Sequence, residues 1–133
     1  MRHFAERDPF VAMVGVEYVS AGLGFATVRM QVHAHHLNFM GTCHGAAIFT
    51  LADTAFGLAS NSHGPIAAGI DAHMTYHLPV KIGEILTATA TEVSRSRKLA
   101  VYRIDVKRED GALTSVFTGT VYISSRQNQL PAS

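Results

Sequence analysis

The alternation of apolar and polar residues predicts a series of short strands and one long apolar segment. From residue 25 to 32, apolar side chains alternate with polar ones, as in a strand that buries one face. The same two-residue period predicts strands over residues 16–20, 68–77, 85–93, 99–107 and 113–124. Glycines at 22, 24 and 111 mark turns between neighbouring strands.

Residues 45–59 break this period and predict a single long helix. Apolar side chains cover nearly every face of that helix, and a helix apolar on all sides is a buried one. A second, short helix is expected over residues 8–13, since Asp8 can cap it and Pro9 suits its first position. Polar segments, residues 33–43 and 61–65, flank the long helix.

One buried helix followed by antiparallel strands can pack in few ways. A flat sheet would leave half of the helix in water, so the sheet must curl around it. The pattern therefore predicts an α+β hotdog fold, an antiparallel β-sheet wrapped around one long central α-helix. We expect a single domain over residues 1–133, with residues 1–8 and 126–133 as flexible termini.

Composition narrows the function classes. The formal net charge is +1, which offers no broad attraction for nucleic acid or an anionic membrane. Apolar residues make up 47% of the chain and charged residues 16%, a balance that favours self-association. The start of the chain lacks the apolar run of a signal peptide, and the single cysteine, Cys43, cannot form an internal disulfide. A cytoplasmic location is expected.

Asp53 is the first candidate for chemistry. It is the only Asp, Glu, Lys or Arg between Arg29 and Asp71, and it lies within the most apolar helix. Burying an ionised carboxylate costs several kcal/mol unless it is paired or hydrogen-bonded. Asp53 is either a functional group that justifies this cost or a helix residue that points to solvent through a gap in the sheet.

The start of the same helix is the second candidate. A helix N-terminus carries free N–H groups and about half a positive charge, and Gly45 lets a ligand approach the backbone. A carbonyl oxygen placed there would be polarised and an oxyanion stabilised. Gly41 and Gly45 could instead serve only a turn, and His44 could be only structural. His44 and Asp53 are nine residues apart, about 13 Å along a helix. The helix start and Asp53 of one chain therefore cannot both reach the same carbonyl carbon. Two antiparallel copies of the helix can bring Asp53 of one chain beside Gly45 of the other, which predicts a homodimer with two shared sites.

The sequence resembles the PaaI-like hotdog thioesterases, the type associated with phenylacetate degradation. Asn38, Gly41, the pair His44-Gly45 and the run Leu51-Ala52-Asp53 carry the resemblance, and residues 61–62, 79, 83 and 117–121 extend it. Where the family pattern has a second glycine after the histidine, this chain has Ala46.

The resemblance implies a role for each of these residues. The Gly45 N–H would bind the thioester oxygen, His44 would shape that site, and Asn38 would hold the carbonyl side or position water. Asp53 of the partner chain would be the nucleophile or general base. The resemblance also implies a homotetramer of two dimers and hydrolysis of acyl-CoA, with coenzyme A as part of the substrate and with no metal or other cofactor. Arylacetyl-CoA, such as phenylacetyl-CoA or a ring-hydroxylated form, is the expected substrate.

Further residues are candidates for substrate binding. Arg95, Arg97 and Lys98 lie in a turn between two predicted strands and could meet the CoA phosphates, or could simply be a solvated basic turn. Phe49, Phe56 and Tyr76 could form the apolar wall around the acyl group, or could belong to the core.

Other functions remain open at this point. The run His33-Ala34-His35-His36 suggests a metal site, although no cysteine pair or nearby acidic residue completes it. A hotdog acyl-CoA hydratase or dehydratase would also need a carboxylate and a histidine. A non-catalytic acyl-CoA-binding protein would bind without hydrolysis. Cys43 is expected to be a small buried residue rather than a nucleophile.

Overall fold

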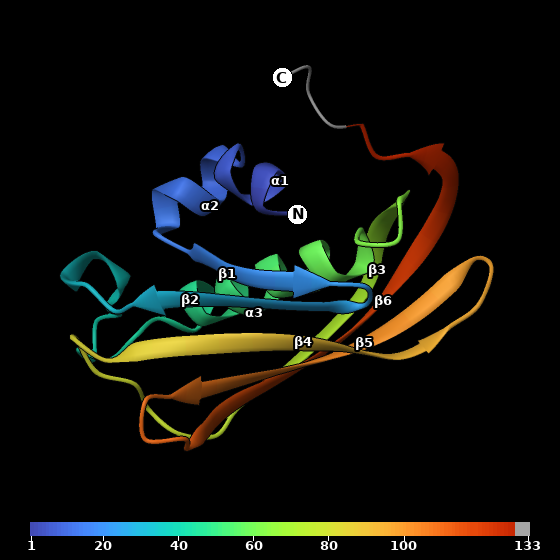
Figure 1. The fold of residues 1–133 in the computed structure, drawn as a ribbon. Helices are drawn as coiled ribbons and strands as arrows, with labels where there is room; N and C mark the ends of the chain where they lie inside the picture. The colour runs from blue at the N-terminus through green and yellow to red at the C-terminus, as the bar shows by residue number, and fades with distance from the viewer. Residues whose placement is uncertain (130–133) are drawn as a thin grey trace.

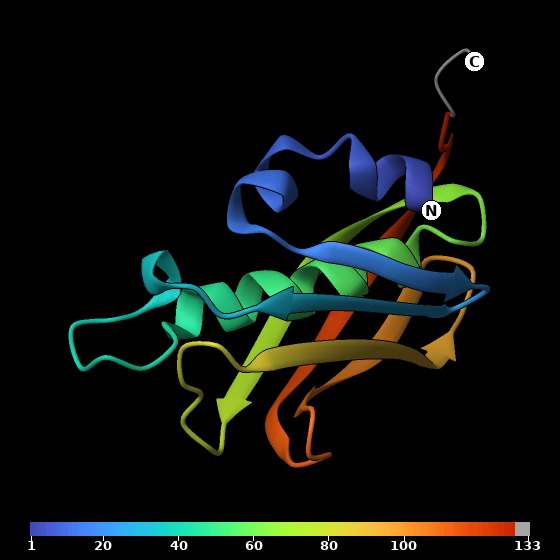
Figure 2. The same ribbon diagram turned by 60° about the vertical axis from the view of Figure 1, so that its left-hand side comes forward.

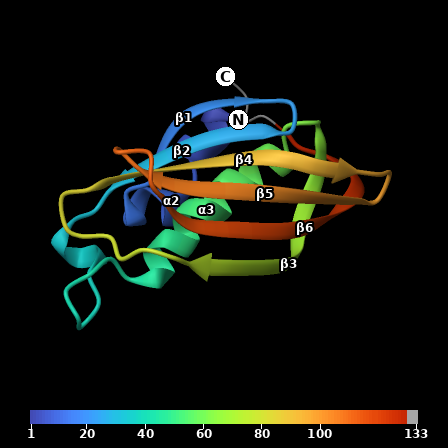
Figure 3. The same cartoon turned by 90° about the horizontal axis from the view of Figure 1, so that it is seen from below.

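The computed structural model of the chain describes residues 1–129 as one sheet packed on one long helix (Figure 1). The strands form an antiparallel sheet in the order β1-β2-β4-β5-β6-β3, and Figure 3 shows them side by side in that order. The elements are α1 (Arg2–Glu6), α2 (Pro9–Val14), β1 (Glu17–Gly22), β2 (Phe25–Gln31), the 3-10 turn η1 (Ala34–His36), α3 (Gly45–Ser60), β3 (Pro65–Tyr76), β4 (Ile85–Arg95), β5 (Leu99–Arg108) and β6 (Leu113–Gln127).

The core lies between the concave face of the sheet and α3. Alternate residues of the central strands are fully buried there, for example Val28 in β2 and Ile104 in β5. Phe56 of α3 packs against the rings of Tyr102 and Phe117 in the sheet, at 5.9 and 5.3 Å between centroids. The Phe56 ring can lie this close to strand β6 because residue 119 is a glycine: a Cβ on Gly119 would lie 2.7 Å from Phe56. The hotdog fold predicted from the sequence is confirmed.

The N-terminal segment departs from the prediction. Residues 1–8, expected to be flexible, include the helix α1, which packs with α2 over the side of α3 that faces away from the sheet (Figures 1 and 2). Asp8 caps α2 by accepting hydrogen bonds from the N–H groups of Phe10 and Val11, as the sequence predicted. Ala5 of α1 and Val11 of α2 are buried, so both helices pack against the rest of the chain.

The prediction that α3 is buried on all sides is wrong. One stripe of the helix is open in the single chain, because the sheet covers only one side and the short helices α1 and α2 cover only part of the other. The open residues are spaced at helical intervals, and most are small or polar. They are Ala46, Thr50, Asp53, Thr54 and Gly57.

The sheet has a long free edge at β3. Among the described strands, β3 pairs only with β6, so the second edge of this twelve-residue strand has no partner. Ile70 on this strand is 61% exposed. A long edge without a partner is a template for pairing with another chain.

Candidate active site

The start of α3 presents one free amide. His44 caps the helix: its Nδ1 accepts a hydrogen bond of 3.0 Å from the Ala46 N–H, and its carbonyl oxygen accepts from Ala47. No residue of the described part of the chain accepts from the N–H of Gly45. That N–H is therefore available to an external oxygen, at the positive end of a sixteen-residue helix.

Tyr76 fixes the peptide of Gly45 in place. Its hydroxyl donates a hydrogen bond of 3.1 Å to the Gly45 carbonyl, and partial burial raises the pKa of this hydroxyl, so it remains a donor. A cavity of about 320 Å³ lies beside the two residues. Its lining is Thr42, Cys43, Gly45, Ile48, Tyr76, His77, Leu78, Pro79 and Val80. Tyr76 is thus a neighbour of the helix start, which its sequence position alone did not indicate.

Asp53 stands on the open stripe of α3, and its side chain is exposed in the single chain. It borders a second cavity, of about 620 Å³, between α3 and the N-terminal helices. The apolar wall of this cavity withdraws hydration from the carboxylate, and this burial raises the pKa of Asp53. The negative charge of Asp8 on α2 raises it further. A carboxyl group with a raised pKa is a stronger base than an ordinary aspartate.

The apolar lining of the Asp53 cavity comes largely from residues that sequence reasoning missed. Met1 and Phe4 of the N-terminal segment and Phe10 of α2 face it together with Phe49 and Leu58 of α3. Residues this close to a chain end showed no period, so only the amphipathic character of a five-residue helix could have pointed to them. The cavity is thus lined by the N-terminal segment and α2 on one side and by α3 on the other.

The three aromatic candidates have different places. Phe49 borders the Asp53 cavity with its ring edge-on to Phe117, at 5.3 Å between centroids. Tyr76 borders the smaller cavity at Gly45. Phe56 is only 3% exposed and packs in the core, so the expectation that it contacts the acyl group does not fit this arrangement.

Asn38 fastens the loop that precedes α3. Its Oδ1 accepts from the N–H groups of Met40 and Thr42, at 2.9 and 3.2 Å, and its Nδ2 donates to Thr42 Oγ1 at 3.1 Å. In the single chain the side chain therefore holds the backbone of residues 38–42. A contact with substrate, as the resemblance implied, would use its remaining N–H.

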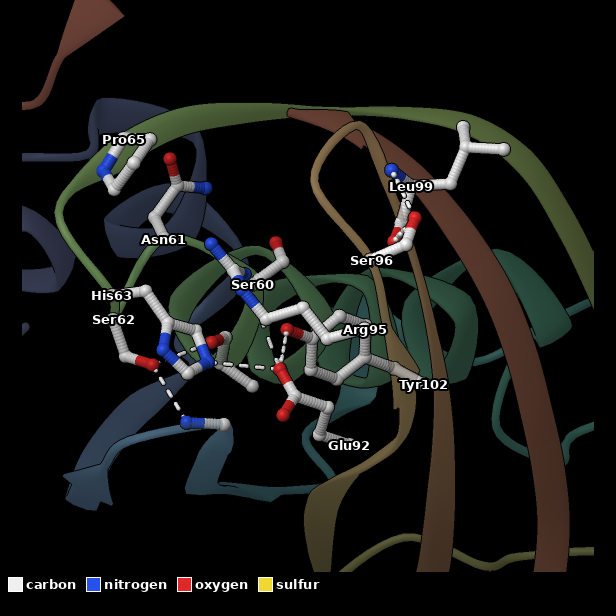
Figure 4. Close-up of polar contacts among 12 residues, drawn as sticks. Ser60, Asn61, Ser62, His63, Pro65, Glu92, Arg95, Ser96, Leu99 and Tyr102 are labelled. Atoms are coloured by element: carbon white, nitrogen blue, oxygen red, sulfur yellow. Dashed lines mark hydrogen bonds and ion pairs between the residues drawn. The ribbon is translucent and has the colours of Figure 1, made fainter. Parts of the chain in front are cut away.

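The three basic candidates are not one cluster. Arg95, at the end of β4, turns back toward Glu92, with 4.0 Å between its Nη1 and Glu92 Oε1 (Figure 4). Arg97 and Lys98 are exposed. Glu92 Oε1 also accepts hydrogen bonds from His63 at 2.8 Å and Tyr102 at 2.6 Å. Burial opposes the charge of Glu92, but these two donors and the nearby cations hold its pKa below the usual range.

The histidine run and the cysteine have structural roles in the single chain. His36 is buried, with Nδ1 accepting from the His33 N–H and Nε2 donating to the Val14 carbonyl, so both ring nitrogens are occupied. Within residues 1–129, no group of three or more His, Cys, Asp or Glu side chains is arranged to hold a metal.

Burial raises the pKa of the Cys43 thiol to about 11, which leaves little thiolate at neutral pH. No helix in this part of the chain has both the length and the apolarity needed to cross a bilayer.

Comparison with known proteins identifies the family to which this chain belongs. The sequence profile of the Thioesterase superfamily matches residues 40–115, more than half of the chain. The chain belongs to the thioesterase superfamily. The matched segment runs from the loop before α3 through β5, so it contains both Gly45 and Asp53.

Relatives within this superfamily are similar over most of their length. The acyl-coenzyme A thioesterase PaaI of Escherichia coli is 35% identical over 114 residues, which are 86% of this chain and 81% of that protein. Its crystal structure superimposes with a TM-score of 0.90 at 32% identity, covering 93% of this chain and 90% of that one. The TT0310 protein of Thermus thermophilus is 44% identical, with a TM-score of 0.84, over 87% and 97% of the two chains.

A third solved structure of this thioesterase superfamily fold contains a ligand. The Smu.793 protein of Streptococcus mutans, solved bound to acetyl CoA, is 27% identical with a TM-score of 0.82, over 86% of this chain and 92% of that one. Together these similarities confirm the prediction of a PaaI-like, hotdog-fold thioesterase, and the chain is a thioester hydrolase by family.

Proposed function

We propose that this protein hydrolyses arylacetyl-CoA of the phenylacetyl-CoA type to the free acid and CoA, at sites shared between two protomers. The observation that carries this proposal is the placement of two groups on one helix. An unoccupied N–H at Gly45 begins α3, and a carboxyl group of raised pKa at Asp53 stands on its open stripe beside an apolar cavity.

Sharing follows from the length of the helix. Gly45 and Asp53 are eight residues apart, about 12 Å along α3, which is too far for both to act on one carbonyl carbon. Two copies with antiparallel α3 helices bring Gly45 of one protomer beside Asp53 of the other, and the two-fold axis makes two such sites in each dimer. The free edge of β3 supports this arrangement, because a second β3 can extend the sheet across a two-fold axis.

The chemistry assigns one task to each group. The Gly45 N–H of one protomer polarises the thioester carbonyl and stabilises the negative oxygen of the tetrahedral intermediate. Asp53 of the partner subunit either attacks the carbonyl carbon, giving an anhydride that water then opens, or takes a proton from the attacking water. In both cases a C–O bond forms, the C–S bond breaks, and CoA leaves as a thiolate. A thiol pKa of about 8.5 makes general acid catalysis of this departure unnecessary.

The cavity beside Asp53 supports an aromatic acyl group. Its volume of about 620 Å³ lies in the range of small-molecule sites, and Phe4, Phe10 and Phe49 offer ring edges and faces for stacking. Arg97 and Lys98 are exposed and could meet CoA phosphates, whereas Arg95 lies back beside Glu92, with 4.0 Å between its Nη1 and Glu92 Oε1. No resident cofactor or metal takes part in this proposal, and a tetramer of two such dimers is the expected assembly.

The hotdog hydratase or dehydratase remains the second candidate function, and the cap on α3 argues against it. That chemistry uses a histidine as base, and His44 has its Nδ1 committed to the Ala46 N–H. Free-thiol release from phenylacetyl-CoA, measured beside the change in double-bond absorbance with an enoyl-CoA, separates the two reactions. Binding of acyl-CoA without either signal would indicate a non-catalytic binding protein.

Asp53→Asn tests the carboxylate. We expect thiol release to fall by about 10²–10⁴, the usual contribution of a general base, with the fold and the oligomer mass unchanged. Asp110→Asn, an exposed aspartate in the β5–β6 turn, is the matched control and should retain activity. Full activity in Asp53→Asn would refute the proposed mechanism.

Mixed dimers test the sharing. Gly45→Pro removes the N–H at a first helical position that tolerates proline. A dimer of one Asp53→Asn chain and one Gly45→Pro chain has one intact site and one doubly defective site. Random mixing should therefore restore about a quarter of wild-type activity from two inactive proteins. No restoration, with mixed dimers shown to be present by mass, would place both groups of a site on one chain.

A further inference from the structure

The loop before α3 is built to hold a fixed shape. The Asn38 side chain ties Met40 and Thr42 to the base of the loop, Leu37 and Cys43 pair across it, and Gly41 turns it with a φ of 82°. The loop extends beyond the first turn of α3, on the side away from the body of the molecule (Figure 2).

The tip of this fixed loop carries two large apolar side chains that the single chain leaves in water. Phe39 is 98% exposed and Met40 is 70% exposed. Single exposed apolar residues are common on protein surfaces. Two adjacent ones on a loop fastened by hydrogen bonds, six residues from the proposed oxyanion donor, indicate a surface that is covered when the site is complete.

The direction of the loop identifies what covers it. When Gly45 of one protomer lies beside Asp53 of the partner subunit, with α3 antiparallel, anything beyond the start of one helix runs toward the end of the other. Gly57 and Asn61 follow Asp53 by about 6 and 12 Å along the helix, and both line the cavity of about 620 Å³. The tip therefore reaches the open C-terminal half of the partner's cavity.

We propose that Phe39 and Met40 of one protomer form a wall of the acyl pocket of its partner, and that they set the size of acyl group accepted there. The tip can act there only if the site is shared, so this proposal rests on the proposed function. It adds two specificity-determining residues from a loop whose own chain contributes the Gly45 N–H.

Substrate selectivity gives the first test. Phe39→Ala and the double variant Phe39→Ala/Met40→Ala enlarge the pocket, so kcat/KM for 4-phenylbutanoyl-CoA relative to phenylacetyl-CoA should rise at least tenfold, the usual effect of changing one pocket contact. Hydrolysis of acetyl-CoA, whose acyl group is too short to reach the tip, should change less than threefold. Leu23→Ala is the matched control, since Leu23 is 77% exposed in the β1–β2 turn. An unchanged selectivity ratio in the double variant would overturn the proposal.

Mixed dimers show which chain supplies the wall. In the pair of Asp53→Asn and Gly45→Pro chains, the intact site takes both its Gly45 N–H and the proposed wall from the Asp53→Asn chain. Phe39→Ala on that chain should shift selectivity, and Phe39→Ala on the Gly45→Pro chain should not. A shift only in the second case would place the tip over its own cavity and overturn the proposal. Failure of the mixed dimer to regain any activity would instead count against the shared site itself.

Discussion

Replacing Gly45 separates the contribution of its N–H from that of its missing side chain. A Cβ on residue 45 would lie 3.3 Å from Tyr76 Cζ and 3.4 Å from both Cε1 and the hydroxyl oxygen. These contacts are a few tenths of an ångström shorter than the 3.5–4.0 Å of ordinary carbon contacts. Gly45→Ala therefore requires a small shift of the Tyr76 ring, and we expect it to cost about 1 kcal/mol of stability, the low end for overpacking. Gly45→Pro adds a Cβ at the same place but also removes the N–H.

The comparison of these two variants isolates the proposed oxyanion donor. Gly45→Ala keeps the donor, and its kcat should fall by about tenfold or less through the displaced Tyr76. Gly45→Pro should lose a further factor of about 10²–10³, or about 2.7–4 kcal/mol of barrier, the usual value of one oxyanion donor. Single-turnover release of CoA thiol measures both, with denaturant titration to follow stability. Equal kcat values for the two variants would refute the role of the N–H.

Two other predictions concern the charge at Asp53 and the packing beneath it. Asp8→Asn keeps the cap on α2 but removes a negative charge that raises the pKa of Asp53, so the acid limb of kcat/KM should move to lower pH; an unmoved limb would exclude this coupling. Gly119→Ala places a Cβ 2.7 Å from Phe56, and should cost about 1–3 kcal/mol of unfolding free energy in urea. Adding Phe56→Leu should recover part of that loss, and no recovery would mean that another contact is responsible.

Sequence periodicity predicted the elements that bury a face. Helix α3 was expected to end at residue 59 and ends at 60, and the five strands after β1 lie within a few residues of their predicted bounds. These segments are long enough for a period to show. The five residues of α1 are too few for a period to show. Helix α1, and with it the part of the Asp53 cavity that the N-terminal segment lines, could therefore not be predicted.

The open stripe on α3 was missed for a different reason. Alanine and glycine count as apolar, yet their small side chains lose little hydrophobic burial energy when they face a groove. Ala46 and Gly57 therefore did not reveal which side of α3 is uncovered. Asp53 itself was the signal: the solvent-facing interpretation fits the single chain, and the functional one stays a prediction. Asp53 faces solvent through a gap in the covering layer, and the same gap is the cavity that raises its pKa.

Arg95 shows how an irregular strand defeats a prediction based on spacing. Residues three apart in a regular strand point to opposite faces, so Glu92 and Arg95 should not meet. A bulge between Glu92 and Ser94 shifts the register of β4 against β5. It brings Arg95 to the side of Glu92 and removes it from the basic turn, where Arg97 and Lys98 stay.

Three features of the single chain are left without a partner, and the proposed dimer accounts for all of them with one two-fold axis. The outer edge of the twelve-residue strand β3 has no partner among the described strands, the stripe of α3 exposes a carboxyl group at an apolar cavity, and a fixed loop holds Phe39 in water. In the proposed dimer, a two-fold axis that pairs β3 with its copy would also set the α3 helices antiparallel, with the helix start beside the partner's carboxylate and the loop tip beside the partner's cavity. Each feature alone admits other partners. The proposed second copy of this chain accounts for the three together, and for that reason we expect dimer formation and hydrolysis to be lost together when the β3 edge is blocked.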